Sequence, residues 1–309
     1  MKSSFFFMLG RAALFLCAGV VSLSVASECA WAKGELREKE ARNLIRRMGG
    51  GELPSGAVRV LSVTPSGPTD AVALAEVETA FRFESDDKER WRVVEIRTGS
   101  DRWEDLTLIA QATGGGTVAD AGAEGGMIAA ARVTGALDGG HAREILASLT
   151  DIRLPSDALR VKEISSLYNS TVVVARVTVE FRFKKGSDNR WRLVEFRTGE
   201  GDWRDLEKIA HAVNTEKARR ARSELEMLAT ALDAFRRERG FFVVADSTGV
   251  LVDQLNPRYL ARVVRLDPWH RPYLYEGERD RYRLLSAGPD GEPGTGDDIN
   301  VAGHGNTGN

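Results

Sequence analysis

The longest helical pattern in the chain lies in its C-terminal third. From Trp203 to Arg239 there is neither Gly nor Pro. Apolar residues recur there at 3-4-3 spacing, at Leu225, Leu228, Leu232 and Phe235. This periodicity predicts a helix from about Thr215 to Arg239 with one buried stripe. If the helix continues back to Trp203 it is about 55 Å long; the alternative is that Asn214-Thr215 begins a new helix as an N-cap.

An internal repeat precedes this helix. Residues 77–113 align with residues 177–213 without a gap, and 18 of the 37 positions are identical. The shared motifs are F-R-F, R-W-R, E-x-R-T-G and W-x-D-L. Such self-similarity predicts a duplicated domain of about 75 residues. We name the two predicted modules the first copy (33–112) and the second copy (138–213).

Both copies are predicted to contain the same elements. A helix comes first, marked by apolar residues at helical spacing: Ala41, Leu44, Ile45 and Met48 in the first copy, and Ile145, Leu146 and Leu149 in the second. Three strand-like runs follow, whose period-two alternation favours a half-buried antiparallel sheet. Asp101 or Asp202 is then predicted to cap a short helix that ends at Ala112 or Val213.

Two interpretations remain open for the repeated aromatic and basic residues. They could line a binding cleft, with Arg92, Arg97, Arg192 and Arg197 beside the tryptophans. Alternatively, the tryptophans are core anchors and the arginines form cross-strand pairs with Glu95 and Glu195 on the solvent face. The tryptophans concerned are Trp91, Trp103, Trp191 and Trp203.

The N-terminal segment, residues 1–32, reads as a secretory signal. Lys2 and Arg11 are its positive charges, an apolar run follows, and Ala30-Trp31-Ala32 fits a cleavage site. The apolar run after Arg11 is about 15 residues, shorter than a membrane span needs, so anchoring by an uncleaved segment is the alternative to export. Both cysteines of the chain lie in this segment, so we expect no disulfide or thiol chemistry in the mature protein.

Charge and histidine placement exclude other classes of function. The chain has 43 basic and 45 acidic residues without a basic block, which argues against nucleic acid as a partner. The four histidines, at positions 141, 211, 270 and 304, show no catalytic or zinc spacing. We therefore expect no enzyme activity. His270 is expected to serve turn geometry or to face solvent, and His304 to lie in a loose tail.

The densest set of oxygen ligands follows the long helix. From Ser286 to Asn309 there are four acidic residues and no Lys or Arg. A hard cation such as calcium takes six to eight oxygens and tolerates an irregular loop. A strand over 282–286 would deliver this loop, and glycines at 288, 291, 294 and 296 would let it turn back, bringing Asp290 near Asp297 and Asp298. The other interpretation is an acidic, glycine-rich surface turn without a metal.

A family resemblance bears on this choice. The sequence SAGPDGEPGTGDDIN, preceded by Asp267-Pro268-Trp269 and Pro272-Tyr273, resembles the C-terminal calcium loop of the major pseudopilin of type II secretion systems, the general secretion pathway protein G family. The helix that ends in ALDAF, followed by Gly240, is similar to the helix of that family. The resemblance spans about residues 215–300. It implies one calcium ion, with Asp290, Asp297 and Asp298 as carboxylate ligands, and subunits that assemble into a periplasmic fibre.

The sequence departs from the family pattern in two places. The family usually has Gly after the Trp, where this chain has His270. The family also fuses its domain directly to a cleavable G-F-x-x-x-E signature and a hydrophobic helix, and no such stretch directly precedes Thr215. We therefore expect the duplicated modules to stand where a pseudopilin keeps its membrane helix.

The predicted fold class is α+β: two helix-plus-antiparallel-sheet modules followed by a pseudopilin-like domain with a long helix, short antiparallel strands and a calcium loop. The predicted segments are a signal peptide (1–32), the first copy (33–112), a Gly/Ala-rich linker (113–137), the second copy (138–213) and the pseudopilin-like domain (214–309).

Two classes of function fit these predictions. The first is an exported, periplasmic, non-enzymatic structural or assembly protein with calcium as cofactor. Its partners would be proteins, with secretion-system pseudopilins or assembly components as the candidates, and membrane contact would come only through a retained signal segment. The second is a periplasmic ligand-binding protein that uses the duplicated modules, with the calcium domain only stabilising it.

Overall fold

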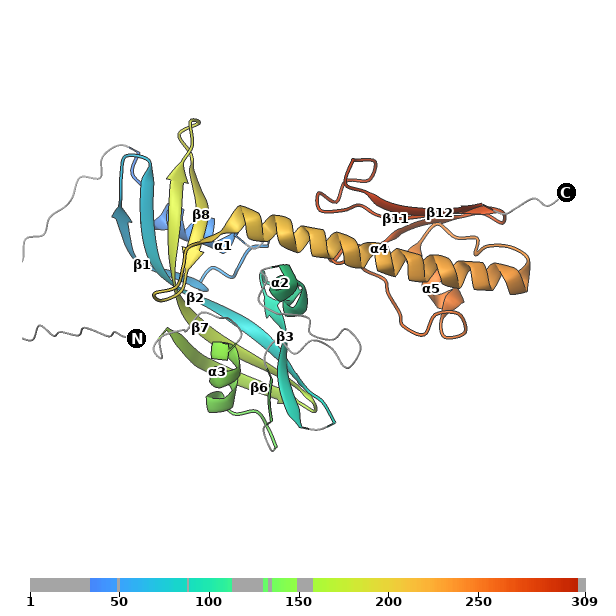
Figure 1. Ribbon diagram of the computed structural model, residues 1–309, viewed down its shortest axis with the longest axis horizontal. Coiled ribbons are helices and arrows are strands. Elements are labelled where there is room, and N and C mark those ends of the chain that lie inside the picture. Colours follow the sequence, from blue (N-terminus) through green and yellow to red (C-terminus); the bar gives the residue numbers. More distant parts are fainter. Residues whose placement is uncertain are drawn as a thin grey trace, which may run out of the picture. The chain divides into compact units, whose positions relative to one another are not determined.

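The computed structural model describes residues 34–48, 51–87, 89–112, 130–132, 135–148 and 158–304. The predicted signal segment, most of the predicted linker, and Leu149 lie outside these ranges. The chain divides into two units, Met1–Glu35 and Leu36–Asn309. All the elements below belong to the second unit, which is α+β as predicted (Figure 1).

Nine strands of the described chain form one antiparallel sheet. The central path is β4-β3-β2-β7-β8-β9, with β1 paired to β2, β6 to β7 and β5 to β3. The strands are β1 (Val58–Pro65), β2 (Asp70–Ser85), β3 (Arg90–Arg97), β4 (Trp103–Asp105), β5 (Ala130–Arg132), β6 (Leu159–Leu167), β7 (Ser170–Lys185), β8 (Trp191–Arg197) and β9 (Arg204–Asp205). Strand β5 lies inside the range predicted as linker.

The centre of this sheet is the pair of long strands β2 and β7. Each has 16 residues, and they run antiparallel with Val77 opposite Val177. These two valines are also matched positions of the sequence repeat. Equivalent residues of the two copies therefore lie directly opposite each other at the middle of the β2–β7 pair. The pairings on either side recur: a bulge follows Arg82 where β2 meets β3, and another follows Arg182 where β7 meets β8.

Two hydrophobic cores flank the sheet, and each draws on both copies. Helix α1 (Glu38–Arg46) buries Ala41 and Ile45 in a core that includes Phe181 and Phe183 of the second copy. Helix α3 (Gly139–Ser148) buries its apolar residues in a core that includes the aromatic residues Phe81, Phe83 and Trp91 of the first copy. Full burial of one Phe side chain stabilises by about 1.5–3 kcal/mol. The contribution of the opposite copy to each core is therefore substantial.

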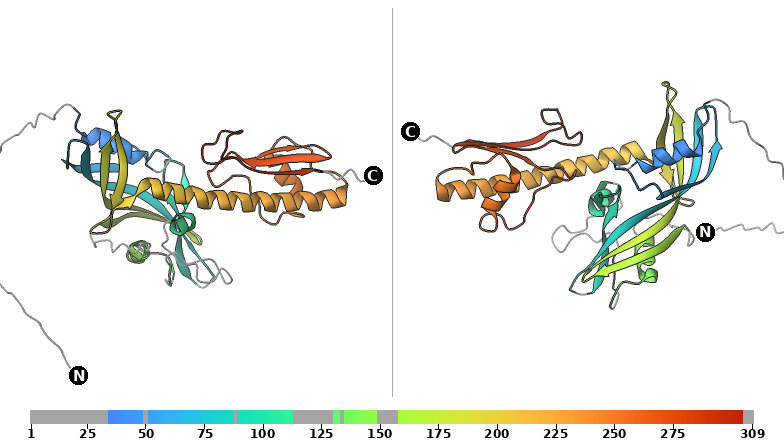
Figure 2. Two further views of the ribbon diagram at one scale, coloured as in Figure 1. Left: turned by 45° about the horizontal axis from the view of Figure 1, so that its top comes forward. Right: turned by 180° about the vertical axis from the view of Figure 1, so that it is seen from behind.

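Helices α1 and α3 lie at different parts of the large sheet, as two further views show (Figure 2). Helix α1 contacts β1 and β8, whereas α3 contacts β6, β3 and β5. Of the apolar residues predicted for the first helix, Met48 lies beyond the end of α1 and is 41% exposed. The boundaries predicted between the modules stay a prediction.

The long helix α4 spans Leu206–Arg239 without interruption. At 1.5 Å per residue its 34 residues extend about 51 Å. The carboxylate of Asp205 caps it by accepting hydrogen bonds from the N–H groups of Glu207 and Lys208. Asn214 therefore lies within the helix, and the alternative of a new N-cap there is wrong. The helix ends at Gly240, whose φ of 82° is the left-handed conformation that favours glycine.

The predicted caps at Asp101 and Asp202 are also wrong. Helix α2 (Leu106–Ala112) begins directly after Asp105, whose carboxylate accepts a hydrogen bond from the N–H of Thr107. In both copies the capping residue is the Asp of W-x-D-L. At Asp101 and Asp202 the chain has not yet entered the short strands β4 and β9, so no helical N–H groups are within reach.

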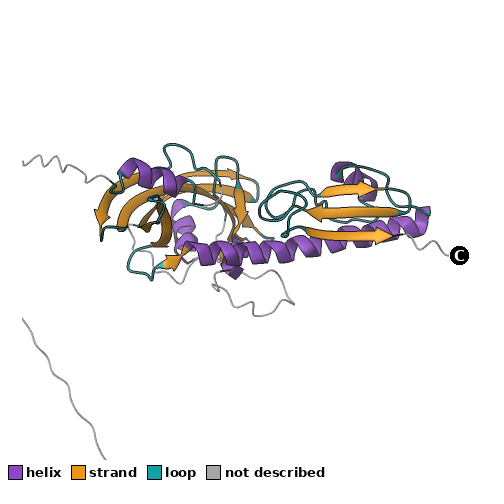
Figure 3. Cartoon of the chain, turned by 90° about the horizontal axis from the view of Figure 1, so that it is seen from above, coloured by secondary structure: helices purple, strands orange, loops and turns teal. Residues whose placement is uncertain are grey.

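The C-terminal core forms along α4. The predicted stripe of Leu225, Leu228, Leu232 and Phe235 is buried, together with residues of α5 (Thr248–Leu255) and of a three-stranded sheet. That sheet has the order β10-β11-β12, with β10 (Leu274–Gly277), β11 (Arg281–Ser286) and β12 (Ile299–His304) lying along the helix (Figure 3). His304 ends a strand, so its assignment to a loose tail is wrong.

Candidate functional site

The acidic loop, residues 287–298, connects β11 to β12. The N–H of Asp290 donates to Oδ2 of Asp297 over 3.1 Å, and the hydroxyl of Thr295 donates to Oδ1 of Asp297 over 2.6 Å. These two contacts hold the pKa of Asp297 below its usual value, the hydroxyl having the larger effect. Oδ2 of Asp298 accepts the N–H of Gly294 over 2.8 Å. The structure thus brings Asp290 beside Asp297 and holds Asp298 through a separate contact.

Glycines allow the loop to turn back on itself. Gly288, Gly291 and Gly294 have φ of 61°, 74° and 95°, whereas Gly296, which the sequence grouped with them, is not at positive φ. A Cβ atom on Gly288 would lie 2.4 Å from the carbonyl oxygen of Asp297. Only glycine fits at this position, because the two ends of the loop come together there.

The acidic loop offers carboxylate and carbonyl oxygens, which are the ligand type that a hard cation prefers. Oδ1 of Asp298 is buried and has no hydrogen-bond partner among the described residues, and such an orphaned carboxylate oxygen is suited to a cation ligand. Within the described residues, no three His, Cys, Asp or Glu side chains converge as a metal-binding group. A cation here would therefore draw most of its ligands from backbone carbonyls and water.

A tight turn, Asp267–Arg271, supports the start of this loop. Oδ1 of Asp267 accepts the N–H groups of Trp269 and Arg271 over 2.9 and 3.0 Å, and Oδ2 accepts the hydroxyl of Ser286 over 2.6 Å. The guanidinium of Arg271 donates to the carbonyl of Gly288 over 2.7 Å. The turn therefore fixes both the end of β11 and the first residues of the acidic loop.

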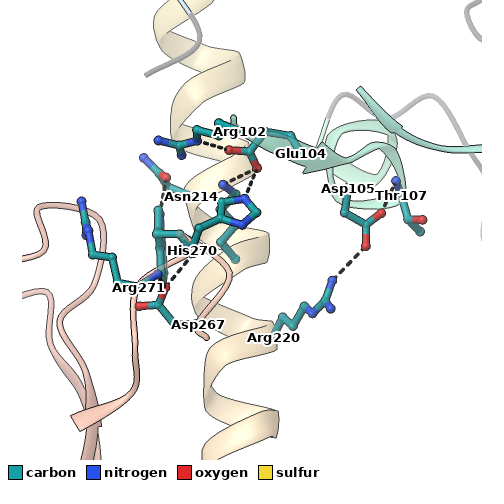
Figure 4. A network of polar contacts seen from close by, with 11 residues as sticks. Arg102, Glu104, Asp105, Thr107, Asn214, Arg220, Asp267, His270 and Arg271 are labelled. Atoms are coloured by element: carbon teal, nitrogen blue, oxygen red, sulfur yellow. Dashed lines mark hydrogen bonds and ion pairs between the residues drawn. The ribbon is translucent and has the colours of Figure 1, made fainter. Parts of the chain in front are cut away.

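The same turn reaches the large sheet through His270. Its φ is 66°, and its Nε2 lies 3.8 Å from Oε2 of Glu104 in β4 (Figure 4). The expectation that His270 faces solvent or serves only turn geometry is thus incomplete, because its side chain contacts a different element. A φ of this sign favours glycine, the residue that the resembled family usually has at this position.

Glu104 is the centre of a buried polar group. It is 6% exposed, its Oε2 lies 2.6 Å from Nζ of Lys217 in α4, and Arg102 donates to its Oε1 over 2.7 Å. Burial alone would raise the pKa of Glu104, but contacts with His270, Lys217 and Arg102 outweigh it and lower the pKa to about 2. Lys217 is itself 3% exposed. A buried ammonium needs a counter-ion, and the large sheet supplies it.

Two further contacts join α4 to its surroundings in the same region. The guanidinium of Arg220 donates to Oδ2 of Asp105 over 2.9 Å, and the indole N–H of Trp269 donates to Oδ1 of Asn214 over 2.9 Å. Figure 4 shows Asp105, Asn214 and Arg220 around α4, in the same region as Glu104 and His270. Residues far apart in sequence therefore form one polar network.

On the large sheet, the repeated residues separate into two kinds. Trp91 and Trp191 are buried in the cores, as the structural interpretation predicts. Trp103 and Trp203 are half-buried and lie under the guanidinium groups of Arg82 and Arg182, at 4.5 and 4.0 Å from the ring centres. Cross-strand ion pairs are present, but Glu95 pairs with Arg82 and Glu195 with Arg182, rather than with the arginines of the E-x-R motif.

Those E-x-R arginines differ between the copies. Arg197 of β8 binds Glu180 over 2.6 Å, whereas Ala80 occupies the equivalent position in the first copy. The Nε atom of Arg97 is buried and has no hydrogen-bond partner in the described structure. Arg92 and Arg192 pair with carboxylates near the hairpin tips, Glu84 and Asp188. The four arginines proposed for a cleft therefore do not gather in one place.

Sequence reasoning missed the residues that join the large sheet to α4 and the turn. Glu104 and Lys217 carry no recognisable motif, and Asp267 was noted only as part of D-P-W; their contacts bridge large sequence separations. One signal was available: Glu104 has Arg204 as its repeat counterpart, a reversal of charge between otherwise similar positions. Separately, no helix within the described ranges is long and apolar enough to cross a membrane.

The long capped helix, the three-stranded sheet packed along it and the acidic loop between the last two strands define a pseudopilin-like C-terminal domain. The family model for type II secretion system protein G matches residues 208–302. The chain is also 35% identical over 100 residues to the type II secretion system core protein G of Escherichia coli K12, an alignment that covers 28% of this chain and 69% of that relative. The chain therefore belongs to the protein G family of type II secretion systems. No solved structure matches it significantly.

Proposed function

We propose that this protein is an exported, periplasmic, non-enzymatic assembly component of a type II secretion system. It would contact the secretion fibre or its assembly apparatus through the pseudopilin-like domain. Family membership through residues 208–302 supports this role. The large sheet gives the protein a second surface that the matched region does not include.

The observation that carries this proposal is the continuity of α4. The matched region begins at residue 208, inside a helix whose N-cap, Asp205, already belongs to the large sheet. In the resembled family a hydrophobic helix directly precedes this domain. Here a folded sheet takes that place, so the chain is suited to attach to a fibre from outside rather than to contribute a helix to its core.

A binding experiment tests this role. The full mature chain is immobilised and exposed to the purified major pseudopilin of the same secretion system. We expect saturable capture of the pseudopilin. An immobilised exported protein without a pseudopilin-like domain serves as the control. Absence of saturable binding to both the major pseudopilin and the purified assembly components would contradict the proposal.

We further propose that the acidic loop binds calcium through Asp290, Asp297 and Asp298. Their carboxylates lie within nine residues without a neighbouring Lys or Arg in the loop, and Oδ1 of Asp298 lacks a partner. A bound cation would offset the repulsion among these carboxylates and hold the loop that joins β11 to β12. Its role would be structural.

The thermal unfolding midpoint of the mature protein tests the calcium proposal. A ligand that binds only the folded state at 100 times its Kd stabilises by about 2.7 kcal/mol, so calcium should raise the midpoint of the wild type. Asp290→Ala and Asp297→Ala should remove this rise. If magnesium at the same concentration has an equal effect, or if the variants respond like the wild type, the loop is an acidic turn without a specific site.

A second candidate function is ligand binding by the large sheet. The specific observation in its favour is Arg97, whose buried Nε lacks the carboxylate partner that Glu180 provides to Arg197. A ligand with a carboxylate group matches this position chemically. In the same thermal experiment, a rise in midpoint with a small carboxylate that Arg97→Gln abolishes and Arg197→Gln does not would favour this function.

A further inference from the structure

The turn Asp267–Arg271 contacts three separate parts of the molecule. Trp269 donates to Asn214 of α4, Asp267 and Arg271 bind Ser286 and Gly288 at the start of the acidic loop, and His270 reaches Glu104 of the large sheet. The turn is internally fixed, because one carboxylate oxygen of Asp267 accepts two of its N–H groups. A displacement at one of its contacts is therefore passed to the others.

The conformation of His270 indicates that its side chain matters. A residue with a Cβ atom at φ of 66° is less stable there than glycine would be. Within the turn itself the backbone N–H of His270 donates to the carbonyl of Asp267 over 2.9 Å, a bond that glycine could also make. What only the side chain provides is the contact with Glu104.

Glu104 is placed for this contact in one copy only. Its repeat counterpart, Arg204, lies in β9 directly before the cap of α4. Glu104 instead faces α4 and the turn, where the groups around it are Arg102 directly before β4, Lys217 of α4 and His270 of the turn. The carboxylate thus sits between three basic side chains from separate places in the chain.

We propose that Glu104 is a positioning residue for the acidic loop. Through its contact with His270, Glu104 holds the turn Asp267–Arg271 against the large sheet, and this turn orders residues 287–298. Docking of the sheet and ordering of the loop are then one cooperative event. A partner that binds the large sheet then changes the affinity of the loop for its own partner. By reciprocity, a partner that binds the loop changes the affinity of the sheet by the same free energy. This coupling does not depend on whether the loop binds a cation.

The loop contains its own reporters of order. Several of its backbone N–H groups are hydrogen-bonded inside the loop, so their exchange with solvent measures how often the loop opens. Their acceptors lie 2.8–3.1 Å away, and the donors are Asp290, Gly291, Glu292 and Gly294. None of these bonds involves Glu104 or His270.

Hydrogen exchange of the full mature chain tests the proposal. Exchange of the peptide covering residues 286–298 is measured by mass spectrometry with a chelator present, so that only protein contacts contribute. Glu104→Gln and His270→Asn should each speed exchange of this peptide roughly 3- to 10-fold. Asn tolerates positive φ, so His270→Asn keeps the turn and the ion pair of Glu104 with Lys217 while removing the contact itself.

Glu195→Gln is the matched control, because it removes a sheet carboxylate that pairs with Arg182 on the same sheet. It should leave exchange of the loop at the wild-type rate, and peptides from β7 should be unchanged in the His270→Asn variant, which keeps the buried ion pair. The proposal is overturned if loop exchange is unaltered in both of those variants, or if Glu195→Gln accelerates it equally.

Discussion

The ion pair of Glu104 with Lys217 is the most demanding contact at the scale of single residues. Both side chains are removed from water, which costs each of them hydration energy, and their mutual attraction offsets this cost only while both are present. Loss of one partner from such a pair costs about 3–5 kcal/mol. Lys217 lies in the family-matched region and Glu104 lies outside it, so the C-terminal domain depends on the large sheet for one of its buried charges.

The low pKa of Glu104 predicts a pH dependence of stability. Its pKa falls from 4.5 to about 2 on folding, so the folded state favours the charged carboxylate. This contribution, on the order of 3 kcal/mol, is present above pH 4.5 and is lost as the pH falls through about 2. Urea unfolding of the wild type and of Glu104→Gln should therefore differ most above pH 4.5 and converge toward pH 2.

The half-exposed Glu195 provides a comparison for that measurement. Glu195→Gln should differ from the wild type by less than about 1 kcal/mol, as is usual for exposed pairs. A gap between the wild type and Glu104→Gln that stays constant from pH 6 to pH 2 would show that the charge of Glu104 contributes nothing to stability.

At the scale of elements, α4 is defined by its two ends as much as by its apolar stripe. Asp205 satisfies N–H groups at its start, and Gly240 closes its end in a conformation that few other residues adopt. Between them the buried leucines hold β10–β12 and α5. The helix is therefore a single rigid connection from the large sheet to the acidic loop's supporting strands.

Two glycines near these helices predict opposite effects of one substitution. Gly240→Ala introduces a Cβ atom at a φ of 82° and should destabilise the protein by about 1 kcal/mol. Gly249→Ala, in the first turn of α5, has open space for its Cβ atom and an ordinary φ, so it should stabilise by about 0.5–1 kcal/mol. Urea unfolding midpoints measure both, and shifts of the same sign would contradict this account.

Local patterns in the sequence predicted these elements well, because their causes are local. The 3-4-3 spacing located the buried face of α4, and alternation located the long strands. The caps at Asp105 and Asp205 were missed because an Asp four or three residues earlier fits the same local rule, and only the path of the short strands decides between them. The placement of Asp290 beside Asp297 was predicted from the loop's glycines, whereas calcium binding itself stays a prediction.

At the scale of the whole molecule, the arrangement of the repeats could not be predicted from the sequence. The apolar face of the helix in each copy can pack on the strands of its own copy or on those of the other copy. The hydrophobic pattern is therefore compatible with two separate cores and with two shared ones. The contact between His270 and Glu104 is hidden for a related reason. It joins positions that no periodicity connects.

The sharing of cores between the copies has a consequence for how the chain becomes folded. Helix α1 and strand β1 share their core with Phe181, Phe183 and Trp191 of the second copy, so this core is complete only when the second copy has been synthesised. Pairing across a hundred residues is also slow, because a long loop must close before any contact rewards it. The first copy therefore stays open until the second has been made. Under the export proposed above, translocation requires an unfolded chain, and the order of the strands along this sequence delays folding for that interval.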